Sequence, residues 1–251
     1  MAERPAISYQ MYSSRNFPDL ARQAGMLAGI GFRCVEPYGG LLADLPALQA
    51  ALQAHDLQAP TVHVGIPMLR EDFDGTMARL RALGVKTAIV PAVPPAERVQ
   101  DREGWQRLGQ ELRDYAHRVR DHGFGFAWHN HHFEFAALPD GSMPLDWILG
   151  DDPLVAWQCD IAWVVRGAQD PVSWIRRYAQ RVVSFHVKDL APEGQNSDED
   201  GWADVGYGRL DWSALLPVMR ETPATVWTLE HDNPSDDARF ARRSFTTVSS
   251  W

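Results

Sequence analysis

The residues with the clearest capacity for chemistry lie in one short stretch, residues 123–135, which reads GFGFAWHNHHFEF. Three of the nine histidines in the chain and one glutamate fall within six of these residues: His129, His131, His132 and Glu134. Phe124, Phe126 and Trp128 occupy one parity and His129 and His131 the other, and the two parities of a β-strand face opposite sides. A buried strand would therefore present imidazoles on one side of its C-terminal end. Imidazole and carboxylate groups bind Zn, Mn, Fe or Co ions and also transfer protons.

Ionisable residues also end five other apolar runs of the chain. These residues are Glu36, His63, Asp160, His186 with Lys188, and Glu230. Neighbouring positions of the opposite parity are apolar, as at Val62, Phe185 and Leu229. A parallel strand that helices cover normally reads apolar on both faces. A polar face at one end of each run therefore predicts that these residues cluster inside a sheet.

Each of these residues also has a purely structural interpretation. His63 alone is typical of a hydrogen-bonded core histidine, and Asp160 of a local cap. Glu230 could pair with Lys188 or Arg209. Together, however, six charges at one end of a buried sheet are hard to explain by packing, because an unpaired buried charge costs several kcal/mol. A divalent cation would offset that cost and would take Asp, Glu and His as ligands.

Eight strand patterns alternate with eight helix patterns along the chain. Strands are expected at residues 6–11, 32–36, 60–64, 87–91, 123–135, 154–161, 182–188 and 225–230, and helices at 20–28, 44–55, 72–83, 105–119, 143–149, 172–178, 211–220 and 235–248. Strict alternation favours a parallel sheet. Eight such units in 251 residues match the usual size of a TIM barrel. The expected fold is an α/β, (β/α)8 TIM barrel that forms a single domain over residues 1–251.

An open, doubly wound sheet is the alternative, since eight parallel strands could also lie flat. Residues 11–15, which read MYSSR, follow the first strand and contain no glycine fingerprint for a phosphate. In a TIM barrel, active-site residues lie at the C-terminal ends of the strands. The ionisable residues above lie at those ends, which favours the barrel.

The overall composition restricts the partners of the protein. The formal net charge is −9, and Lys and Arg are scattered, which disfavours nucleic acid or an anionic membrane as a partner.

Cys34 and Cys159 lie inside apolar runs and are expected to be reduced core thiols of a cytoplasmic protein. The first ten residues form no apolar signal core, and no run of 18 apolar residues occurs, so neither secretion nor a membrane span is expected. The sequence leaves a homo-oligomer open.

Several motifs together resemble a known family. They read HNHHFEF at 129–135, CD at 159–160, SFHVKD at 184–189, DVGYGRLDW at 204–212 and LEHD at 229–232. In this order they are similar to the sugar phosphate isomerase/epimerase family of xylose-isomerase-like barrels. That family includes inosose dehydratases, ketose 3-epimerases and 3-keto-glycoside lyases. The resemblance runs over nearly the whole chain.

The resemblance implies one divalent metal ion, with Mn2+ expected and Zn2+, Co2+ or Mg2+ as alternatives. Carried over by position, Asp160, His186 and Glu230 would be ligands from the sixth, seventh and eighth strands. Ketose epimerases of the family have a glutamate at the end of the fifth strand, where this chain has His129. Glu134 is the expected fifth-strand ligand, with His129 as its rival. In some relatives the eighth-strand glutamate is also the catalytic base.

The chemistry that the resemblance implies takes place at a carbon beside a carbonyl. A metal that binds the carbonyl oxygen stabilises the enediolate formed when that carbon loses a proton. The candidate proton-transfer residues are Glu230, His63, His129 and Glu36. The candidate substrate contacts are His131, Lys188, Arg209 and the aromatic faces of Trp128 and Trp163. Returning the proton gives an epimer or an isomer, whereas loss of a β-substituent gives the lyase or dehydratase alternative on a 3-keto-glycoside or inosose.

Two other functions fit a barrel of this kind. A base-excision endonuclease needs a three-metal cluster and a basic face for DNA, and the net charge of −9 opposes it. A sugar-binding barrel without catalysis would bind a metal but turn over no keto-sugar. Lys188 and Arg209 are the only cations that the sequence places near the site, so a neutral carbohydrate is preferred to a sugar phosphate.

Overall fold

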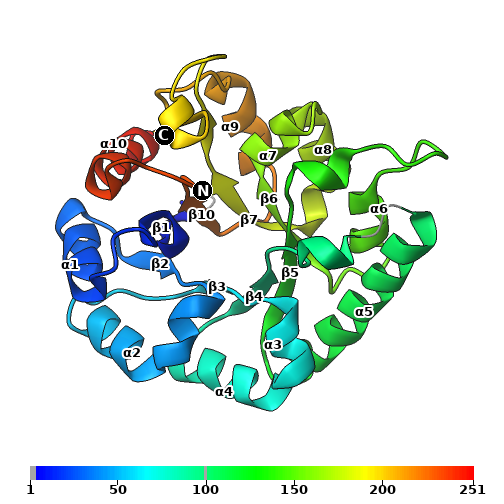
Figure 1. Ribbon diagram of the computed structural model, residues 1–251, viewed down its shortest axis with the longest axis horizontal. Helices are drawn as coiled ribbons and strands as arrows, with labels where there is room; N and C mark the ends of the chain where they lie inside the picture. Colours follow the sequence, from blue (N-terminus) through cyan, green and yellow to red (C-terminus); the bar gives the residue numbers. More distant parts are fainter. Residues whose placement is uncertain (1–3, 99–100) are drawn as a thin grey trace.

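Eight parallel strands form the centre of the computed structural model, which describes residues 4–98 and 101–251. They are β1 (Ala6–Gln10), β2 (Cys34–Glu36), β3 (Thr61–His63), β4 (Thr87–Val90), β5 (Gly125–His129), β6 (Ala156–Asp160), β7 (Val182–Val187) and β10 (Val226–Leu229). Their order in the sheet is β2-β1-β10-β7-β6-β5-β4-β3, so these strands follow one another around the sheet in chain order. Figure 1 shows them inside a ring of helices.

The two edge strands of this sheet meet and nearly close the barrel. Isolated parallel bridges join Cys34 to Gln58 and Tyr38 to His63. The Val35 N–H donates to the Gln58 carbonyl at 2.8 Å, and the His63 N–H donates to the Pro37 carbonyl at 2.9 Å. The expected TIM barrel is therefore confirmed, and the open, doubly wound sheet is wrong.

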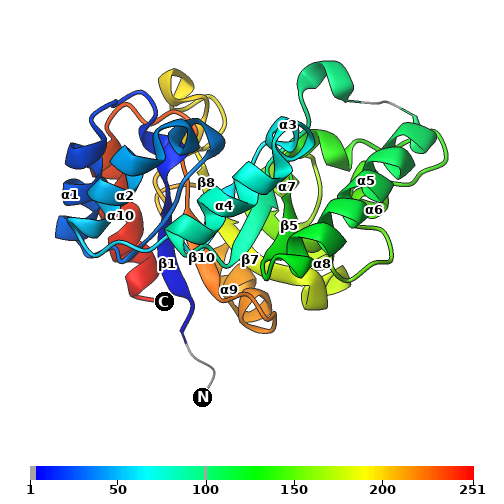
Figure 2. The same cartoon turned by 90° about the horizontal axis from the view of Figure 1, so that it is seen from below.

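Ten α-helices surround the strands in the part of the chain that the structure describes. They are α1 (Leu20–Ile30), α2 (Leu45–Gln53), α3 (Ile66–Glu71), α4 (Phe73–Leu83), α5 (Arg102–Asp121), α6 (Pro144–Leu149), α7 (Ile161–Arg166), α8 (Pro171–Arg177), α9 (Trp212–Arg220) and α10 (Asp237–Ser249). In the side view of Figure 2, α1, α2 and α10 cover one flank and α5 and α6 the other. An aspartate side chain caps most of these helices, as Asp101 does at α5 by accepting from Gly104 N–H. Within the described ranges, no helix combines the length and apolarity needed to cross a membrane.

Four short helices and strands were not expected from the sequence. The helices α3 and α7 have six residues each, which is too short for a helical periodicity to show. The strands β8 (Asp189–Leu190) and β9 (Trp202–Ala203) pair in an antiparallel hairpin between the expected strand at 182–188 and the expected helix at 211–220. In that segment Trp202 is only 1% exposed.

The alternation of side chains along each strand separates an apolar layer from a polar barrel interior. Trp157 and Cys159 of β6 join the apolar core, whereas Gln158 and Asp160 belong to the buried polar residues. The register aligns Asp160 with His186, and His186 with Thr228, so polar residues of neighbouring strands fall side by side. Neither Cys34 nor Cys159 forms a disulfide, and Cys159 is fully buried. The same alternation brings the ionisable strand ends to one place.

Candidate metal centre and active site

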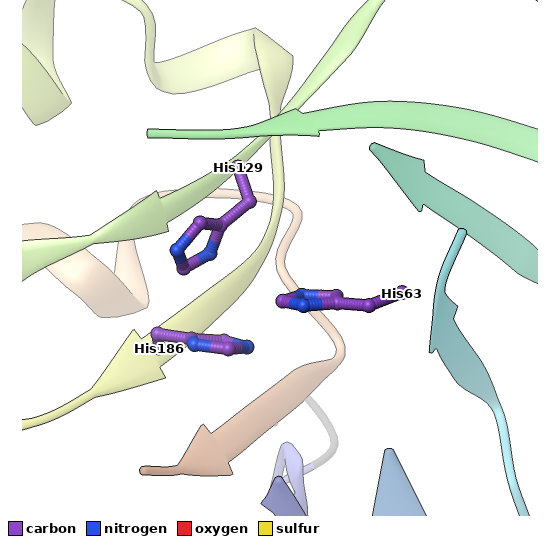
Figure 3. A group of neighbouring side chains, drawn as sticks. All are labelled: His63, His129 and His186. Carbon is purple, nitrogen blue, oxygen red and sulfur yellow. The ribbon is translucent and has the colours of Figure 1, made fainter. Parts of the chain in front are cut away.

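Three histidines converge inside the barrel from three different strands. His63 ends β3, His129 ends β5 and His186 lies in β7, and Figure 3 shows their rings gathered around one point. The rings of His63 and His186 stack with centroids 5.1 Å apart. The ring of His129 meets that of His186 edge-on at 4.4 Å. All three side chains are buried.

Four side chains at this point form what we call the outer group. They are His129, Asp160, His186 and Glu230, and each offers one ligand atom within 4.8 Å of the others. The shortest approach is 2.9 Å, between His186 Nδ1 and Glu230 Oε2. His129 Nε2 and His186 Nδ1 each lie 3.9 Å from Asp160 Oδ2. Two imidazoles and two carboxylates form a donor set that suits Mn, Fe, Co or Zn ions.

The surroundings of Asp160 indicate that the outer group lacks a positively charged partner. Its Oδ1 atom accepts the Trp163 N–H at 2.9 Å and so caps α7. Its Oδ2 atom is buried and has no hydrogen-bond partner. A buried carboxylate oxygen without a partner carries a desolvation penalty of about 1–3 kcal/mol or more. A cation bound between Oδ2 and the neighbouring ligand atoms would remove that penalty, so the residues present fit a divalent metal.

A second set of polar side chains, which we call the inner layer, lies within the barrel, and two of its members, Glu36 and Gln158, contact the histidines. It consists of Gln10, Glu36, Thr61, Gln158 and Ser184, all at most 4% exposed. Glu36 Oε1 lies 2.6 Å from His186 Nε2 and 3.0 Å from His63 Nε2. Burial would raise the pKa of Glu36, but His63 and His186 outweigh it and hold the pKa well below its ordinary value.

The inner layer corrects one sequence prediction. Glu36 was a candidate proton-transfer residue, but its side chain is completely buried and does not line the cavity above the site. Both of its oxygens already accept hydrogen bonds, including those from Gln10 Nε2 and Gln158 Nε2, each at 2.8 Å. Glu36 therefore has no free oxygen with which to take a proton from a substrate.

A cavity of about 430 Å3 opens over the outer group. Its polar and ionisable lining residues include His63, His129, His131, Glu230 and Asp232. The segments after the first four strands add Tyr12, Tyr38, Pro67, Met68 and Pro91. None of the described residues that line it is a lysine or an arginine. This cavity therefore offers both polar and apolar contacts, and no cation for a phosphate group.

Lys188 is buried between carboxylates and does not line that cavity. Its Nζ atom lies 2.6 Å from Asp232 Oδ2 and 3.2 Å from Glu230 Oε2, and 4.0 Å from the centre of the Trp202 ring. Burial would lower the pKa of Lys188, but Asp232 and Glu230 outweigh it and raise the pKa. The expected direct contact between Lys188 and substrate is not supported, because Asp232 occupies the cavity wall in its place.

The protonation states of the outer group follow from burial and from its neighbours. Burial, reinforced by His186, holds the pKa of His129 well below its ordinary value, so this imidazole is neutral and offers a lone pair. Burial would lower the pKa of His186, but Glu230 and Glu36 raise it to about 10. Burial raises the pKa of Asp160 to about 7 against the pull of Lys188. A metal ligand must be deprotonated, so metal binding here would release a proton from His186.

Comparison with known proteins now identifies the family. The xylose isomerase-like TIM barrel model matches residues 25–247. The chain belongs to this family.

Two curated relatives match part of the chain. An inosose dehydratase from Geobacillus kaustophilus is 25% identical over 188 residues, which cover 65% of this chain and 60% of that protein. The rhizopine catabolism protein MocC from Rhizobium meliloti is 27% identical over 137 residues, which cover 50% and 42% respectively. The matched part of this chain thus spans less than two thirds of the length of either relative.

Solved structures share the fold of this family member at low sequence identity. A sugar phosphate isomerase/epimerase from Parabacteroides distasonis superposes with a TM-score of 0.77 at 18% identity, over 99% of this chain and 95% of that one. The IolI protein, whose crystal structure has a bound zinc atom, superposes with a TM-score of 0.76 at 14% identity, over 98% and 97%. At such identities these two likenesses show the fold alone.

The structure does not bring Glu134, the expected fifth-strand ligand, into the outer group. Glu134 lies in a 3-10 helix (His132–Phe135), where Oε2 accepts the His131 N–H at 2.8 Å and Oε1 accepts from Trp128 Nε1 at 3.2 Å. Its carboxylate is therefore bound to its own segment, and His129 supplies the fifth-strand atom of the group instead. Trp128, expected as a sugar-stacking face, is fully buried in the apolar core and lies outside the cavity.

The remaining predicted contacts divide between the cavity wall and its surroundings. His131 lines the cavity, and its ring packs against Trp163 with centroids 5.2 Å apart. Trp163 is itself half-buried in α7 and does not line the cavity. Arg209 is exposed and also lies outside it. The structure also places Tyr12, Tyr38, Gln158 and Asp232 at the site. None of them is a charged residue at the end of an expected strand, so the sequence pattern did not indicate them.

The buried Glu134 predicts a distinct pH dependence of stability. Burial raises its pKa to about 8, against 4.5 in an unfolded chain. Between these values the folded protein keeps a proton that the unfolded chain has lost, so the free energy of unfolding falls as pH rises. Relative to Glu134→Gln, the wild-type protein should lose at least about 1 kcal/mol between pH 5 and pH 8. Urea denaturation of metal-free protein measures this loss, with the exposed Glu193→Gln as control. Parallel pH profiles for the wild type and Glu134→Gln would contradict the burial argument.

Proposed function

We propose that the protein is a divalent-metal-dependent isomerase or epimerase that acts on a neutral sugar or keto-sugar by proton transfer beside a carbonyl. The observation that carries this proposal is the outer group around the unpartnered Asp160 Oδ2, next to a cavity that Glu230 and His63 also line. The proposed metal site and the two proposed proton-transfer groups, Glu230 and His63, would then lie around the same cavity. The family relationship supports the same general chemistry.

The cavity lining supports a neutral, polyhydroxylated substrate. No described lining residue is cationic, so nothing there would neutralise a phosphate. Asp232 and His131 offer polar atoms for hydroxyl groups, while the ring of Tyr38 offers an apolar face for the C–H side of a sugar. This division is expected of a pocket that orients a sugar by a few polar contacts.

His129, Asp160, His186 and Glu230 would hold the ion, which we propose to be Mn2+, with Zn2+ or Co2+ as alternatives. Two imidazole ligands make Mg2+ the weakest of the metals expected from the sequence. Bound there, the ion would supply the positive charge that stabilises the oxyanion formed as the carbon beside the carbonyl loses its proton. The chain itself must move the proton.

Two residues of the chain are placed for proton transfer. Glu230 lines the cavity, and we propose it as the group that removes the proton. Burial would raise its pKa, but Lys188 and His186 outweigh burial and hold the pKa well below its ordinary value. Glu230 is therefore ionised, which is the form that a general base requires. His63 also lines the cavity and is proposed as the group that returns it.

His129 is not proposed for proton transfer. Its Nδ1 atom lies 3.1 Å from Gln158 Oε1, and its Nε2 atom faces Asp160 in the outer group. Both ring nitrogens are thus committed.

His129 and Glu134 can be separated by metal content. His129→Gln is expected to lose the metal, because a ligand atom of the outer group disappears. Glu134→Gln is expected to keep it, because both carboxylate oxygens of Glu134 bind within the same segment. Elemental analysis of the two purified variants after incubation with Mn2+ measures the difference. The reverse pattern would return the fifth-strand ligand role to Glu134.

A dehydratase acting on an inosose is the second candidate, and one observation favours it. Several of the curated relatives are inosose dehydratases. Loss of water requires an acid for the departing hydroxyl as well as a base for the proton. Asp232 lines the cavity next to Glu230, and burial raises its pKa, which suits it to that task. Lys188 would hold its carboxylate in place.

One experiment tests the proposal and separates the two candidates. The purified protein is incubated with Mn2+ in deuterated water against a panel of ketoses, inososes and 3-keto-glycosides, and products are identified by NMR. We expect deuterium beside the carbonyl of at least one neutral substrate, together with an epimer or isomer. Dehydrated product from an inosose selects the second candidate. A metal-loaded protein that exchanges no proton in any substrate contradicts both and leaves a sugar-binding barrel.

A further inference from the structure

The inner layer contains the only residues described here that contact the proposed histidine ligands through their other ring nitrogens. His186 Nε2 lies 2.6 Å from Glu36 Oε1, on the opposite side of the ring from the Nδ1 atom that faces Glu230. His129 Nδ1 lies 3.1 Å from Gln158 Oε1, while its Nε2 atom faces Asp160. Each ligand ring therefore has one nitrogen in the outer group and one in the inner layer.

The chemistry of the inner layer decides which nitrogen carries the hydrogen. An ionised carboxylate accepts hydrogen bonds and donates none. Glu36 therefore requires a hydrogen on His186 Nε2. In the metal-free protein Nδ1 of His186 also carries a hydrogen, which it donates to Glu230. When a metal displaces that proton, Glu36 keeps the hydrogen on Nε2, so the lone pair lies on Nδ1, toward Asp160 and Glu230.

The same carboxylate acts on His129 through Gln158. The Gln158 Nε2 atom donates to Glu36 Oε2 at 2.8 Å and to Ser184 Oγ at 3.1 Å. Because only the amide nitrogen can donate to a carboxylate, the carbonyl Oε1 must face His129 Nδ1. That oxygen requires a hydrogen on Nδ1, which leaves the lone pair of His129 on Nε2.

We propose that Glu36 is a positioning residue that presets the tautomers of both histidine ligands, His186 directly and His129 through Gln158. Both lone pairs then meet at the position of the metal. Two residues from β2 and β6 thus orient ligands on β7 and β5 without touching the metal or the substrate. This inference rests on the metal site proposed above.

The same hydrogen bonds would restrict the histidine cluster to one metal position. His63, His129 and His186 also offer ligand atoms within 4.8 Å of one another. On this inner side, however, Glu36 and Gln158 already accept from the ring nitrogens, since His63 Nε2 lies 2.7 Å from Gln158 Oε1. A hydrogen on each of these nitrogens leaves no lone pair for an ion.

Three variants test the positioning role by Zn2+ affinity and by NMR of histidine nitrogens in the Zn2+-loaded protein. Glu36→Gln should weaken Zn2+ binding about 10–100-fold, the usual scale for the hydrogen-bond partner of a ligand histidine. It should also alter the nitrogen signals of both His129 and His186. Gln158→Met should alter those of His129, and those of His63, but not those of His186. Thr61→Val is the matched control: it removes the hydrogen bond from Thr61 Oγ1 to Glu36 Oε2 and no histidine contact, and should cost less than about 10-fold.

Each outcome either supports or overturns the positioning role of Glu36. Wild-type Zn2+ affinity and wild-type nitrogen signals in Glu36→Gln overturn the proposal, as does an equal loss of affinity in Thr61→Val. Should Glu36→Gln not fold, changed His129 signals with unchanged His186 signals in Gln158→Met still support the proposal, and unchanged His129 signals overturn it. A wild-type protein that binds no Zn2+ contradicts the metal site itself, which separates failure of the proposed function from failure of the positioning role.

Discussion

Replacing Asp160 with asparagine is expected to abolish metal binding while the barrel stays folded. An asparagine keeps a carbonyl oxygen that can accept the Trp163 N–H and cap α7, as Oδ1 does now. Its amide nitrogen replaces Oδ2, the atom that faces His129, His186 and Lys188 without a hydrogen-bond partner. The metal affinity should fall by more than about 100-fold, beyond the range for an outer-shell partner.

Elemental analysis after incubation with Mn2+, together with circular dichroism, checks this expectation. Asp170→Asn is the matched control, because Asp170 is an exposed aspartate that caps the next helix, α8, away from the site. It should bind metal as the wild type does. His186→Ala should lose the metal as Asp160→Asn does. Full occupancy in Asp160→Asn or His186→Ala would remove that residue from the ligand set.

Glu230→Gln is expected to lower kcat by at least about 100-fold, the usual scale for loss of a general base. Exchange of deuterium into the substrate should fall by the same factor, because the lost step is proton removal itself. Metal affinity should fall only modestly, since the Lys188 ammonium donates to Oε2 and would keep the amide oxygen of the glutamine at that position, where it can still bind the ion. The change keeps the size of the side chain, so an effect on the fold should be small.

Asp232→Asn is the informative comparison for that variant. If Asp232 assists a leaving hydroxyl, this change should slow dehydration and leave proton exchange near the wild-type rate. Normal exchange in Glu230→Gln, with net conversion stopped, would show that another residue removes the proton. His63 would then be the next to test, because it is the remaining cavity residue proposed to move protons.

The sequence predicted the barrel and the gathering of its ionisable strand ends for one physical reason. Side chains alternate across a strand, so a polar parity at one end of a buried strand must face the interior. Asp160 and His186 follow this rule and lie side by side in the register. Gln158 follows it as well, but an uncharged side chain does not stand out in a search for charges. Its role emerged only from its contacts.

The position of Glu134 could not be predicted in the same way. It lies beyond the end of β5, in a 3-10 helix where its carboxylate accepts the His131 N–H and forms a capping box. That local hydrogen bond depends on backbone angles, which residue spacing does not reveal. Lys188 was mispredicted for a related reason. Its charge indicated a substrate contact, whereas Asp232, two residues after Glu230, separates it from the cavity.

The location of the bound metal tests most directly the claim that the outer group is a metal site. Crystals of the protein with Mn2+, measured near the manganese absorption edge, would show the ion as an anomalous difference peak. We predict one peak per chain, in contact with His129 Nε2, Asp160 Oδ2, His186 Nδ1 and Glu230 Oε2. A peak on the inner nitrogens of His63 and His186, or one bound by Glu134, would contradict the account.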